Sequence, residues 1–106
     1  MAKGLKADEG KNRYDLLPAD ALEEITQVFT FGSFKYADRN WEKGMQWGRV
    51  FGACMRHLWA WGRGEQYDKE SGLRHLAHAG CCVMFLLAYD IRGRSKFDDR
   101  PLEYTN

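Results

Sequence analysis

Residues 57–78 contain all three histidines of the chain, together with three closely spaced carboxylates. Imidazole nitrogens and carboxylate oxygens bind divalent metal ions, and they exchange protons near neutral pH. The residue types and their spacing therefore predict a metal site or an acid/base site. The candidate metal ligands are His57, Glu65, Asp68, His75 and His78, and the candidate catalytic carboxylates are Glu65, Asp68 and Glu70.

The composition of this group restricts the choice of metal. Oxygen ligands favour Mg²⁺ or Mn²⁺, whereas histidine ligands shift the preference toward Mn²⁺, Fe²⁺ or Zn²⁺. We expect a divalent metal cofactor, Mg²⁺ or Mn²⁺, with Zn²⁺ or Fe²⁺ as alternatives. The competing interpretation is structural, with hydrogen-bonded histidines in the core and with Asp68 and Glu70 as helix caps.

Helical periodicity in the sequence predicts where these side chains lie. Apolar residues repeat with helical spacing in three segments, which predict helices from Pro18 to about Tyr36, over Trp47–Arg63 and over Glu70–Arg92. The second and third helices flank a short turn and form an antiparallel hairpin. At about 1.5 Å of rise per residue, His57 and His75 fall in nearly the same layer of that hairpin.

The length of the chain indicates one domain over residues 1–106, and the helical periodicity indicates an all-α class, a small bundle of three main helices that we expect oligomerisation to complete. We expect a flexible or ligand-ordered arm at about residues 1–14, a buried third helix and an irregular tail at about residues 93–106. A hydrophobic content of 44% is too high for a disordered chain. The three cysteines lack a CxxC spacing, so we interpret them as reduced core residues.

Charge and hydropathy limit the partners. A net charge of +1 with interleaved acidic and basic residues makes nucleic acid an unlikely partner. There is no apolar signal segment and no apolar run long enough to cross a bilayer, so we expect a cytoplasmic protein without a membrane partner. A small-molecule ligand and a second copy of the chain are the expected partners.

Five runs carry a resemblance to a known family. They are KNRYDLLP at residues 11–18, FGSFKY at 31–36, RNWEKG at 39–44, RHL at 56–58 and DKESGLRHLAHA at 68–79. Over residues 11–89 the chain resembles the N-terminal domain of the largely phage-encoded dATP/dGTP diphosphohydrolases. The resemblance implies metal-dependent removal of pyrophosphate from a purine deoxynucleoside triphosphate, in the manner of the all-α MazG-like pyrophosphohydrolases.

The MazG-like signature, EExxE followed by ExxD, is matched only in part. Residues 23–27 and 65–68 resemble its two halves, with Gln27 in place of the last glutamate of the first half. The two halves also lie farther apart in the sequence than that signature normally allows.

Cations and aromatic residues could bind the nucleotide, through phosphate contacts and base stacking. Trp41 or Trp47 could stack on the base, whereas Trp59 and Trp61 point about 200° apart on their helix, which places one of them in the core or an interface. The alternative is that the charged loops are simply solvated. The predicted nucleotide-binding residues are Lys11, Arg13, Lys35, Arg39, Asn40, Trp41, Lys43 and Arg56.

These observations favour a metal-dependent pyrophosphohydrolase that acts on dGTP- or dATP-like nucleotides and releases the monophosphate and pyrophosphate. The alternative is a non-catalytic phage module that binds or sequesters a purine nucleotide. A nucleic-acid-binding helical protein is the third and least favoured class.

Overall fold

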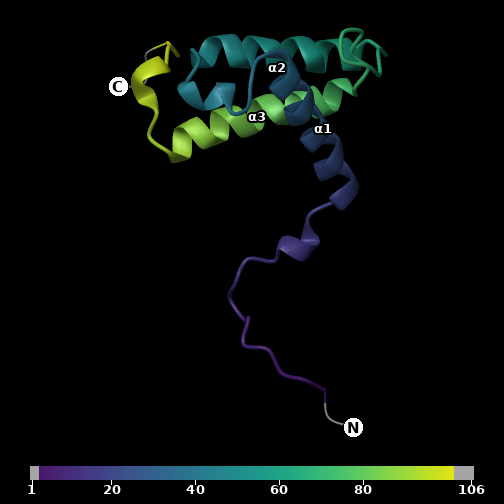
Figure 1. Cartoon of the computed structure of the whole chain (residues 1–106), viewed down its shortest axis with the longest axis vertical. Helices are drawn as coiled ribbons and strands as arrows, with labels where there is room; N and C mark the ends of the chain where they lie inside the picture. Colours follow the sequence, from purple (N-terminus) through teal and green to yellow (C-terminus); the bar gives the residue numbers. More distant parts are fainter. Residues whose placement is uncertain (1–2, 102–106) are drawn as a thin grey trace.

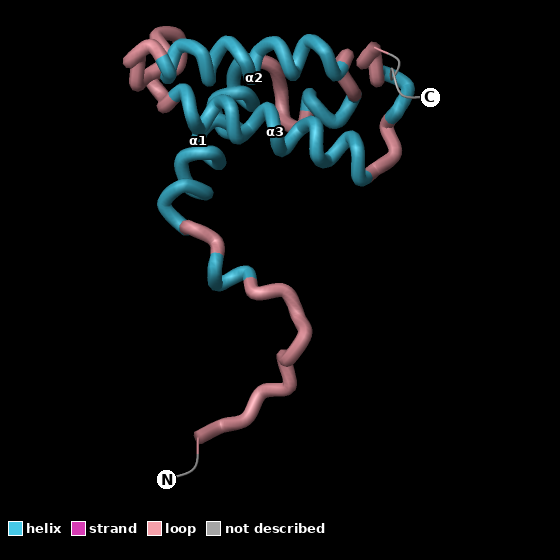
Figure 2. The backbone as a smooth tube through the Cα atoms, turned by 180° about the vertical axis from the view of Figure 1, so that it is seen from behind, coloured by secondary structure: helices cyan, strands magenta, loops and turns pink. Residues whose placement is uncertain are grey.

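A computed structural model describes residues 3–101 of the chain as an all-α fold (Figure 2). Within that range the only β-pairing is an isolated bridge between Tyr67 and Arg74. No helix there is long and apolar enough to cross a membrane. The predicted all-α class is confirmed. The helices are α1 (Ala19–Lys35), α2 (Trp47–Gly62) and α3 (His75–Ile91), with short 3-10 helices η1 (Tyr14–Leu16), η2 (Asn40–Lys43) and η3 (Ser95–Phe97).

Helices α2 and α3 lie side by side and antiparallel, while α1 packs across α3 near its N-terminal end (Figure 1). Gly80 permits this crossing, because a Cβ atom at position 80 would lie 2.8 Å from Ile25 Cδ1 of α1. Val28 of α1 is buried there with Ala77 and Cys81 of α3. The predicted hairpin is therefore present, and α1 covers part of a second face of α3.

Tyr89 is the most deeply buried large side chain of the larger core, which lies between α2 and α3. Its hydroxyl donates a hydrogen bond of 2.6 Å to the Trp41 carbonyl oxygen. The Trp41 ring in turn stacks on Phe85 of α3, with ring centroids 5.1 Å apart. The connection between α1 and α2, which contains η2, is thus fastened to the C-terminal half of α3.

The third helix begins at His75, five residues later than the predicted start at Glu70. Residues 67–74 form a closed loop in which the Asp68 N–H donates to the Leu73 carbonyl and the Gly72 N–H donates to the Asp68 carbonyl, both at 2.7 Å. Gly72 adopts a φ of +74°, which favours glycine. A helical pattern in the sequence cannot reveal this loop, because its hydrogen bonds compete with the first turn of the helix.

The expected burial of α3 is only partly correct, because a stripe on its outer face stays exposed. A second apolar stripe is exposed on α2, and both Trp59 and Trp61 are exposed, so neither indole lies in the core of this chain. The α3 stripe consists of Leu76, Val83, Met84, Leu87 and Ile91, and the α2 stripe consists of Phe51, Met55, Leu58 and Trp59.

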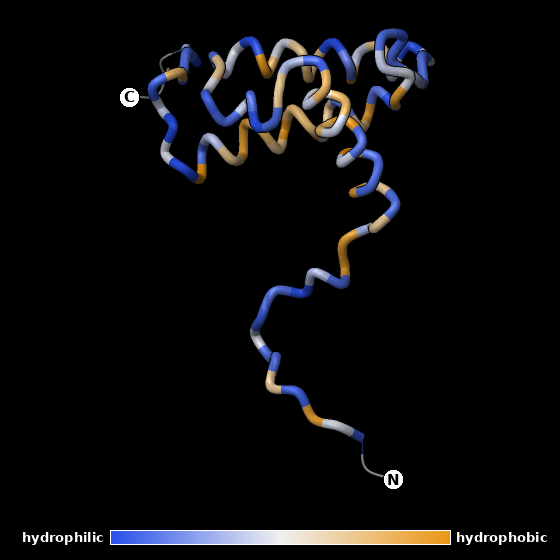
Figure 3. Tube along the Cα trace, viewed as in Figure 1, coloured by the Kyte–Doolittle hydropathy of each residue, from blue (hydrophilic) through white to orange (hydrophobic). Residues whose placement is uncertain are grey.

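The N-terminal arm runs away from the bundle as a mostly hydrophilic segment (Figures 1 and 3). In its described part the arm leads into one short helix, η1. At the other end, residues 93–101 fold back on the bundle: η3 forms, and Asp99 Oδ1 accepts a hydrogen bond of 2.7 Å from the Gly48 N–H at the start of α2. The predicted arm and tail also include residues 1–2 and 102–106, which lie outside the described residues.

We expect the three cysteines to react slowly with a thiol reagent such as DTNB while the protein is folded. All three are buried, and burial raises the pKa of Cys81 to about 12 and that of Cys82 to about 11. The thiolate is the reactive form, so little of it is present at pH 8. Labelling kinetics with and without denaturant measure this, and rapid labelling of the folded protein would contradict the burial.

Candidate metal centre

Three side chains from different parts of the hairpin meet at one end of the bundle. His57 comes from α2, Asp68 from the closed loop and His75 from the first turn of α3, and one potential ligand atom of each lies within 4.8 Å of the others. The Nδ1 atoms of His57 and His75 are 2.9 Å apart. Two nitrogens bound to one ion at about 2.1 Å would lie roughly 3.0–3.4 Å apart. The observed 2.9 Å is a hydrogen-bond distance slightly shorter than that range, so the two rings would separate by a few tenths of an ångström to share an ion.

His75 is the one buried polar or charged residue among residues 3–101. Its Nε2 atom has no hydrogen-bond partner there, and Glu65 Oε1 faces it at 3.5 Å. Leaving a buried donor unpaired costs about 1–3 kcal/mol. A carboxylate that faces the second nitrogen of a histidine is the arrangement that orients metal-bound imidazoles in many proteins. Glu65 therefore lies beside the group, in a position to orient His75.

His78 also joins the cluster, but through different contacts. Its ring stacks on His57 with centroids 4.5 Å apart. Its Nε2 atom lies 2.6 Å from Ser71 Oγ and 3.7 Å from Asp68 Oδ2. His78 is therefore close to the predicted ligands, while its Nε2 atom is engaged by a hydroxyl.

Ser71 was not among the predicted site residues. Its N–H and Oγ each contact Asp68 Oδ2 at 2.9 Å. A signal was present in the sequence, because a serine three residues after an aspartate commonly forms local hydrogen bonds to it. The prediction of a helix from Glu70 onward hid this signal.

The pKa directions indicate neutral histidines beside an ionised carboxylate. Burial lowers the pKa of His57 and of His78, and the neighbouring histidines lower it further. Burial raises the pKa of Asp68, but the two hydrogen bonds from Ser71 together with the nearby histidines outweigh it, so the net pKa is lowered. Neutral imidazoles and an ionised carboxylate are the forms that bind a metal ion.

We expect the metal-free protein to lose stability as the pH falls below about 6.5. The folded-state pKa values of His57 and His78 lie below the ordinary value of 6.5, so the unfolded chain binds more protons than the folded chain in that range. Urea midpoints at pH 7.5, 6.5 and 5.5 in EDTA measure the trend. A midpoint that rises toward pH 5.5 would contradict the assigned pKa directions, and His57→Gln should flatten the trend.

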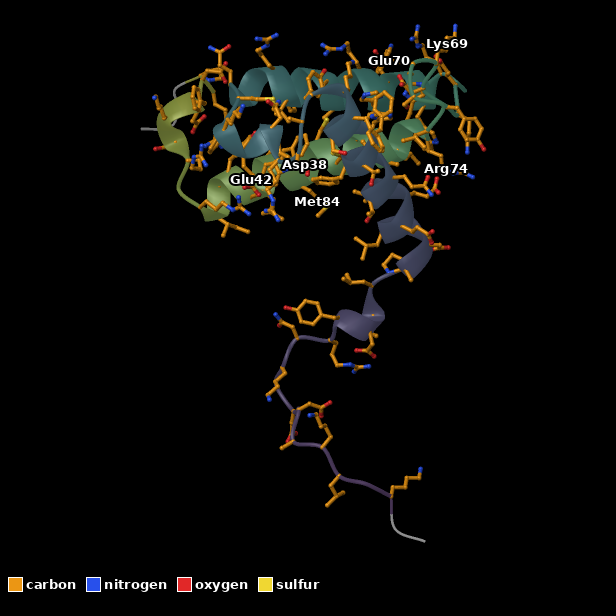
Figure 4. All side chains as sticks on the ribbon, viewed as in Figure 1. Asp38, Glu42, Lys69, Glu70, Arg74 and Met84 are labelled. Atoms are coloured by element: carbon orange, nitrogen blue, oxygen red, sulfur yellow. The ribbon has the colours of Figure 1, made fainter. Side chains whose placement is uncertain are left out.

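The remaining predicted carboxylate, Glu70, is exposed and lies outside the three-residue group. Both of its oxygens accept hydrogen bonds of 2.9 Å from Lys35 Nζ. Figure 4 shows Glu70 with Lys69 and Arg74 at the same end of the bundle. This ion pair joins the closed loop to the C-terminal end of α1.

Two of the predicted nucleotide-binding residues lie near the cluster. Arg56 precedes His57 in α2, and its charge contributes to lowering the pKa of His57. The charge of Lys35 acts in the same direction on the pKa of His78. Both cations therefore lie close enough to the cluster to act electrostatically on its histidines, and their contact with phosphate stays a prediction.

The other predicted nucleotide-binding residues lie elsewhere. Lys11 and Arg13 belong to the projecting arm, where Arg13 pairs with Asp15. Four more lie in or beside η2, which packs near Phe85, about 15 Å along α3 from His75 at 1.5 Å per residue. These four residues are Arg39, Asn40, Trp41 and Lys43.

Both candidate base-stacking indoles are packed by side chains of this chain. Trp41 stacks on Phe85, and Arg92 lies 5.1 Å from the centre of its ring. Trp47 is buried, with Arg100 lying 4.9 Å from its ring. Base stacking would require either ring to leave these contacts, so this role stays a prediction.

The two MazG-like halves do not combine into one ligand set. On α1, Glu24 accepts a hydrogen bond of 3.1 Å from Arg74 Nε. Among residues 3–101, the only group of three or more side chains able to hold a metal ion is His57, Asp68 and His75. The second half thus contributes Asp68 to a histidine-containing group in which the α1 glutamates have no part.

The fold and the cluster together define an all-α domain with a candidate metal centre of two histidines and one aspartate. A family model described as dATP/dGTP diphosphohydrolase, N-terminal, matches residues 1–100, and the chain belongs to this family. A dATP/dGTP diphosphohydrolase of Salmonella phage PMBT28 is 34% identical over 97 residues. The match covers 92% of this chain but 33% of that relative, so the chain spans about a third of its length. No solved structure matches the chain.

Proposed function

We propose that this domain holds a divalent metal ion at His57, Asp68 and His75 and takes part in hydrolysing a purine deoxynucleoside triphosphate to the monophosphate and pyrophosphate. The observation that carries the proposal is the convergence of these three ligand groups within 4.8 Å. The name of the phage relative, a dATP/dGTP diphosphohydrolase, supports the substrate class.

The donor set fits the proposed ion. Two imidazole nitrogens and one carboxylate oxygen suit Mn²⁺, Fe²⁺ or Zn²⁺ better than Mg²⁺, which prefers oxygen ligands. When bound, such an ion neutralises phosphate charge and lowers the pKa of a coordinated water. Three protein ligands leave positions open for water and phosphate oxygens, as catalytic sites require.

The neighbouring side chains supply the remaining functions. Glu65 is part exposed and faces His75 Nε2, where its carboxylate can orient the imidazole; its second role, as the base for an attacking water, stays a prediction. Lys35 and Arg56 can balance the charge of the triphosphate. In the reaction, the water oxygen bonds to the α-phosphorus, the bond from that phosphorus to the bridging oxygen breaks, and pyrophosphate leaves.

The test combines calorimetry with product analysis on the full chain. We expect Mn²⁺ binding near one ion per chain, binding of dGTP or dATP, and release of equal amounts of pyrophosphate and deoxynucleoside monophosphate. Release of inorganic phosphate would contradict the proposed bond cleavage. Absence of both metal and nucleotide binding would reject the function as a whole.

The alternative is a non-catalytic module that binds or sequesters a purine nucleotide. The chain matches 33% of the phage relative, so the name of that relative does not by itself assign the activity to the matched third. Metal and nucleotide binding without pyrophosphate release would select this alternative.

We further propose that the chain forms a homo-oligomer. A monomer commonly exposes single, scattered apolar residues, whereas α2 and α3 each expose a continuous apolar stripe. Helices of a second copy can cover these stripes. Sedimentation of the wild-type chain at micromolar concentration should show a dimer or larger species. Met84→Glu, in the α3 stripe, should shift the distribution toward monomer, and a wild-type monomer would reject the proposal.

A further inference from the structure

Ser71 lies at the centre of a hydrogen-bond network beside the candidate metal centre. Its N–H donates to Asp68 Oδ2 at 2.9 Å, and its Oγ lies 2.9 Å from the same oxygen. The Oγ atom also lies 2.6 Å from His78 Nε2 and accepts a hydrogen bond of 3.1 Å from the Leu73 N–H. One hydroxyl therefore has three side-chain or backbone neighbours at hydrogen-bond distance.

The number of protons determines the direction of each bond. A serine hydroxyl has one hydrogen to donate and two lone pairs that accept. The Leu73 N–H occupies one lone pair. An ionised Asp68 can only accept, so the single hydroxyl hydrogen must point to Asp68 Oδ2. The second lone pair then faces His78 Nε2, and that nitrogen must carry a hydrogen.

The opposite assignment leaves a repulsive contact. If Ser71 donated to His78, two oxygens would face each other at 2.9 Å with no hydrogen between them. The network therefore specifies the tautomer of His78, with the hydrogen on Nε2.

The network also distinguishes the two oxygens of Asp68. Among residues 3–101, the Asp68 carboxylate accepts two hydrogen bonds, one from the Ser71 N–H and one from the Ser71 hydroxyl, and both end on Oδ2. Oδ1 is therefore the carboxylate oxygen that stays available to bind a metal ion. Hydrogen bonds that hold one carboxylate oxygen fix the direction of the other, as outer-shell groups do around metal ligands.

We propose that Ser71 is a positioning residue: with His78 as its hydrogen-bond donor, it holds Asp68 Oδ2 and directs Oδ1 toward the candidate metal centre. The role in metal binding rests on the proposed function. In this arrangement His78 belongs to the hydrogen-bond network around the site, and His57, Asp68 and His75 contact the metal ion directly.

Two measurements on the full chain test this. Long-range ¹⁵N–¹H spectra in EDTA at pH 7.5 should show the Nε2–H tautomer of His78 in the wild type and in Ser71→Thr, which keeps the hydroxyl. Ser71→Ala should produce a mixture of tautomers. Calorimetry should show that Ser71→Ala weakens Mn²⁺ binding by about 10- to 100-fold, while Ser71→Thr keeps the wild-type affinity. Ser33→Ala, whose hydroxyl bonds to the Thr30 carbonyl within α1, is the matched control and should change neither measurement.

The outcomes separate this inference from the proposed function. A wild-type protein that binds no Mn²⁺ would reject the metal centre, and the tautomer would still decide whether the network exists. Unchanged Mn²⁺ affinity in folded Ser71→Ala would overturn the positioning role while leaving the metal centre in place. If Ser71→Ala does not fold, the wild-type spectrum decides, because an Nδ1–H tautomer of His78 would overturn the assignment.

Discussion

His75→Ala and Asp68→Asn should each remove most of the divalent-metal binding of this chain, and the double variant should bind little worse than either single variant. Both residues contribute to one group of ligand atoms. Changes in outer-shell groups around metals cost about 10- to 100-fold in affinity, so loss of a direct ligand should cost at least about 100-fold. Groups that act as a unit also show strongly non-additive losses. Calorimetry with Mn²⁺ on the two single variants and the double variant measures this, and hydrolysis of dGTP should fall in parallel.

A matched control tests whether the loss is specific to the cluster. Asp90→Asn makes the same carboxylate-to-amide change at an exposed position near the far end of α3, and it should leave Mn²⁺ affinity unchanged. A purely structural cluster predicts a different pattern. His75→Ala and Asp68→Asn would then lower stability by about 1–3 kcal/mol while the folded variants kept the wild-type metal content.

Tyr89→Ala should lower the free energy of unfolding by about 3–5 kcal/mol, the range for deleting a buried aromatic side chain. The residue is 1% exposed and packs between Trp41 and Trp47. Tyr89→Phe keeps the ring but leaves the Trp41 carbonyl without its donor, which should cost about 1–3 kcal/mol. Urea denaturation followed by circular dichroism measures both changes.

Tyr14→Ala provides the comparison, because Tyr14 is exposed on η1 in the projecting arm. A surface substitution of this kind should change stability by less than about 0.5 kcal/mol. Equal losses for Tyr14→Ala and Tyr89→Ala would show that the core between α2 and α3 is not organised around Tyr89.

Periodicity in the sequence was sufficient to predict the helices and the meeting of His57 with His75. The boundaries of α2 follow from a regular apolar stripe, and the hairpin then fixes which layers face each other. The start of α3 could not be found in this way. Its position depends on backbone hydrogen bonds within residues 67–74, and periodicity does not report these.

The candidate nucleotide-binding residues show a second limit of sequence patterns. Trp41 is a candidate binding residue because it lies among cations and amides in a polar loop, and that role stays a prediction, but no local pattern indicates its packing. Its packing partners, Phe85 and Tyr89, lie more than 40 residues further along the sequence. Local composition cannot reveal such a contact. The contacts of Ser71 were missed for a different reason, because the predicted helix from Glu70 hid the loop in which Ser71 meets Asp68 and reaches His78.

The closed loop at residues 67–74 has a consequence for the entropy of ligand binding. Its ends are joined by the Tyr67–Arg74 bridge, and hydrogen bonds inside it fix the backbone on both sides of Asp68. A ligand carried on a disordered loop loses conformational freedom when the ion binds, at roughly 1–2 kcal/mol of backbone entropy per ordered residue. Here that freedom is already lost when the chain folds. The cluster should therefore capture an ion with little reorganisation, and its affinity should depend mainly on the donor atoms and not on ordering of the loop.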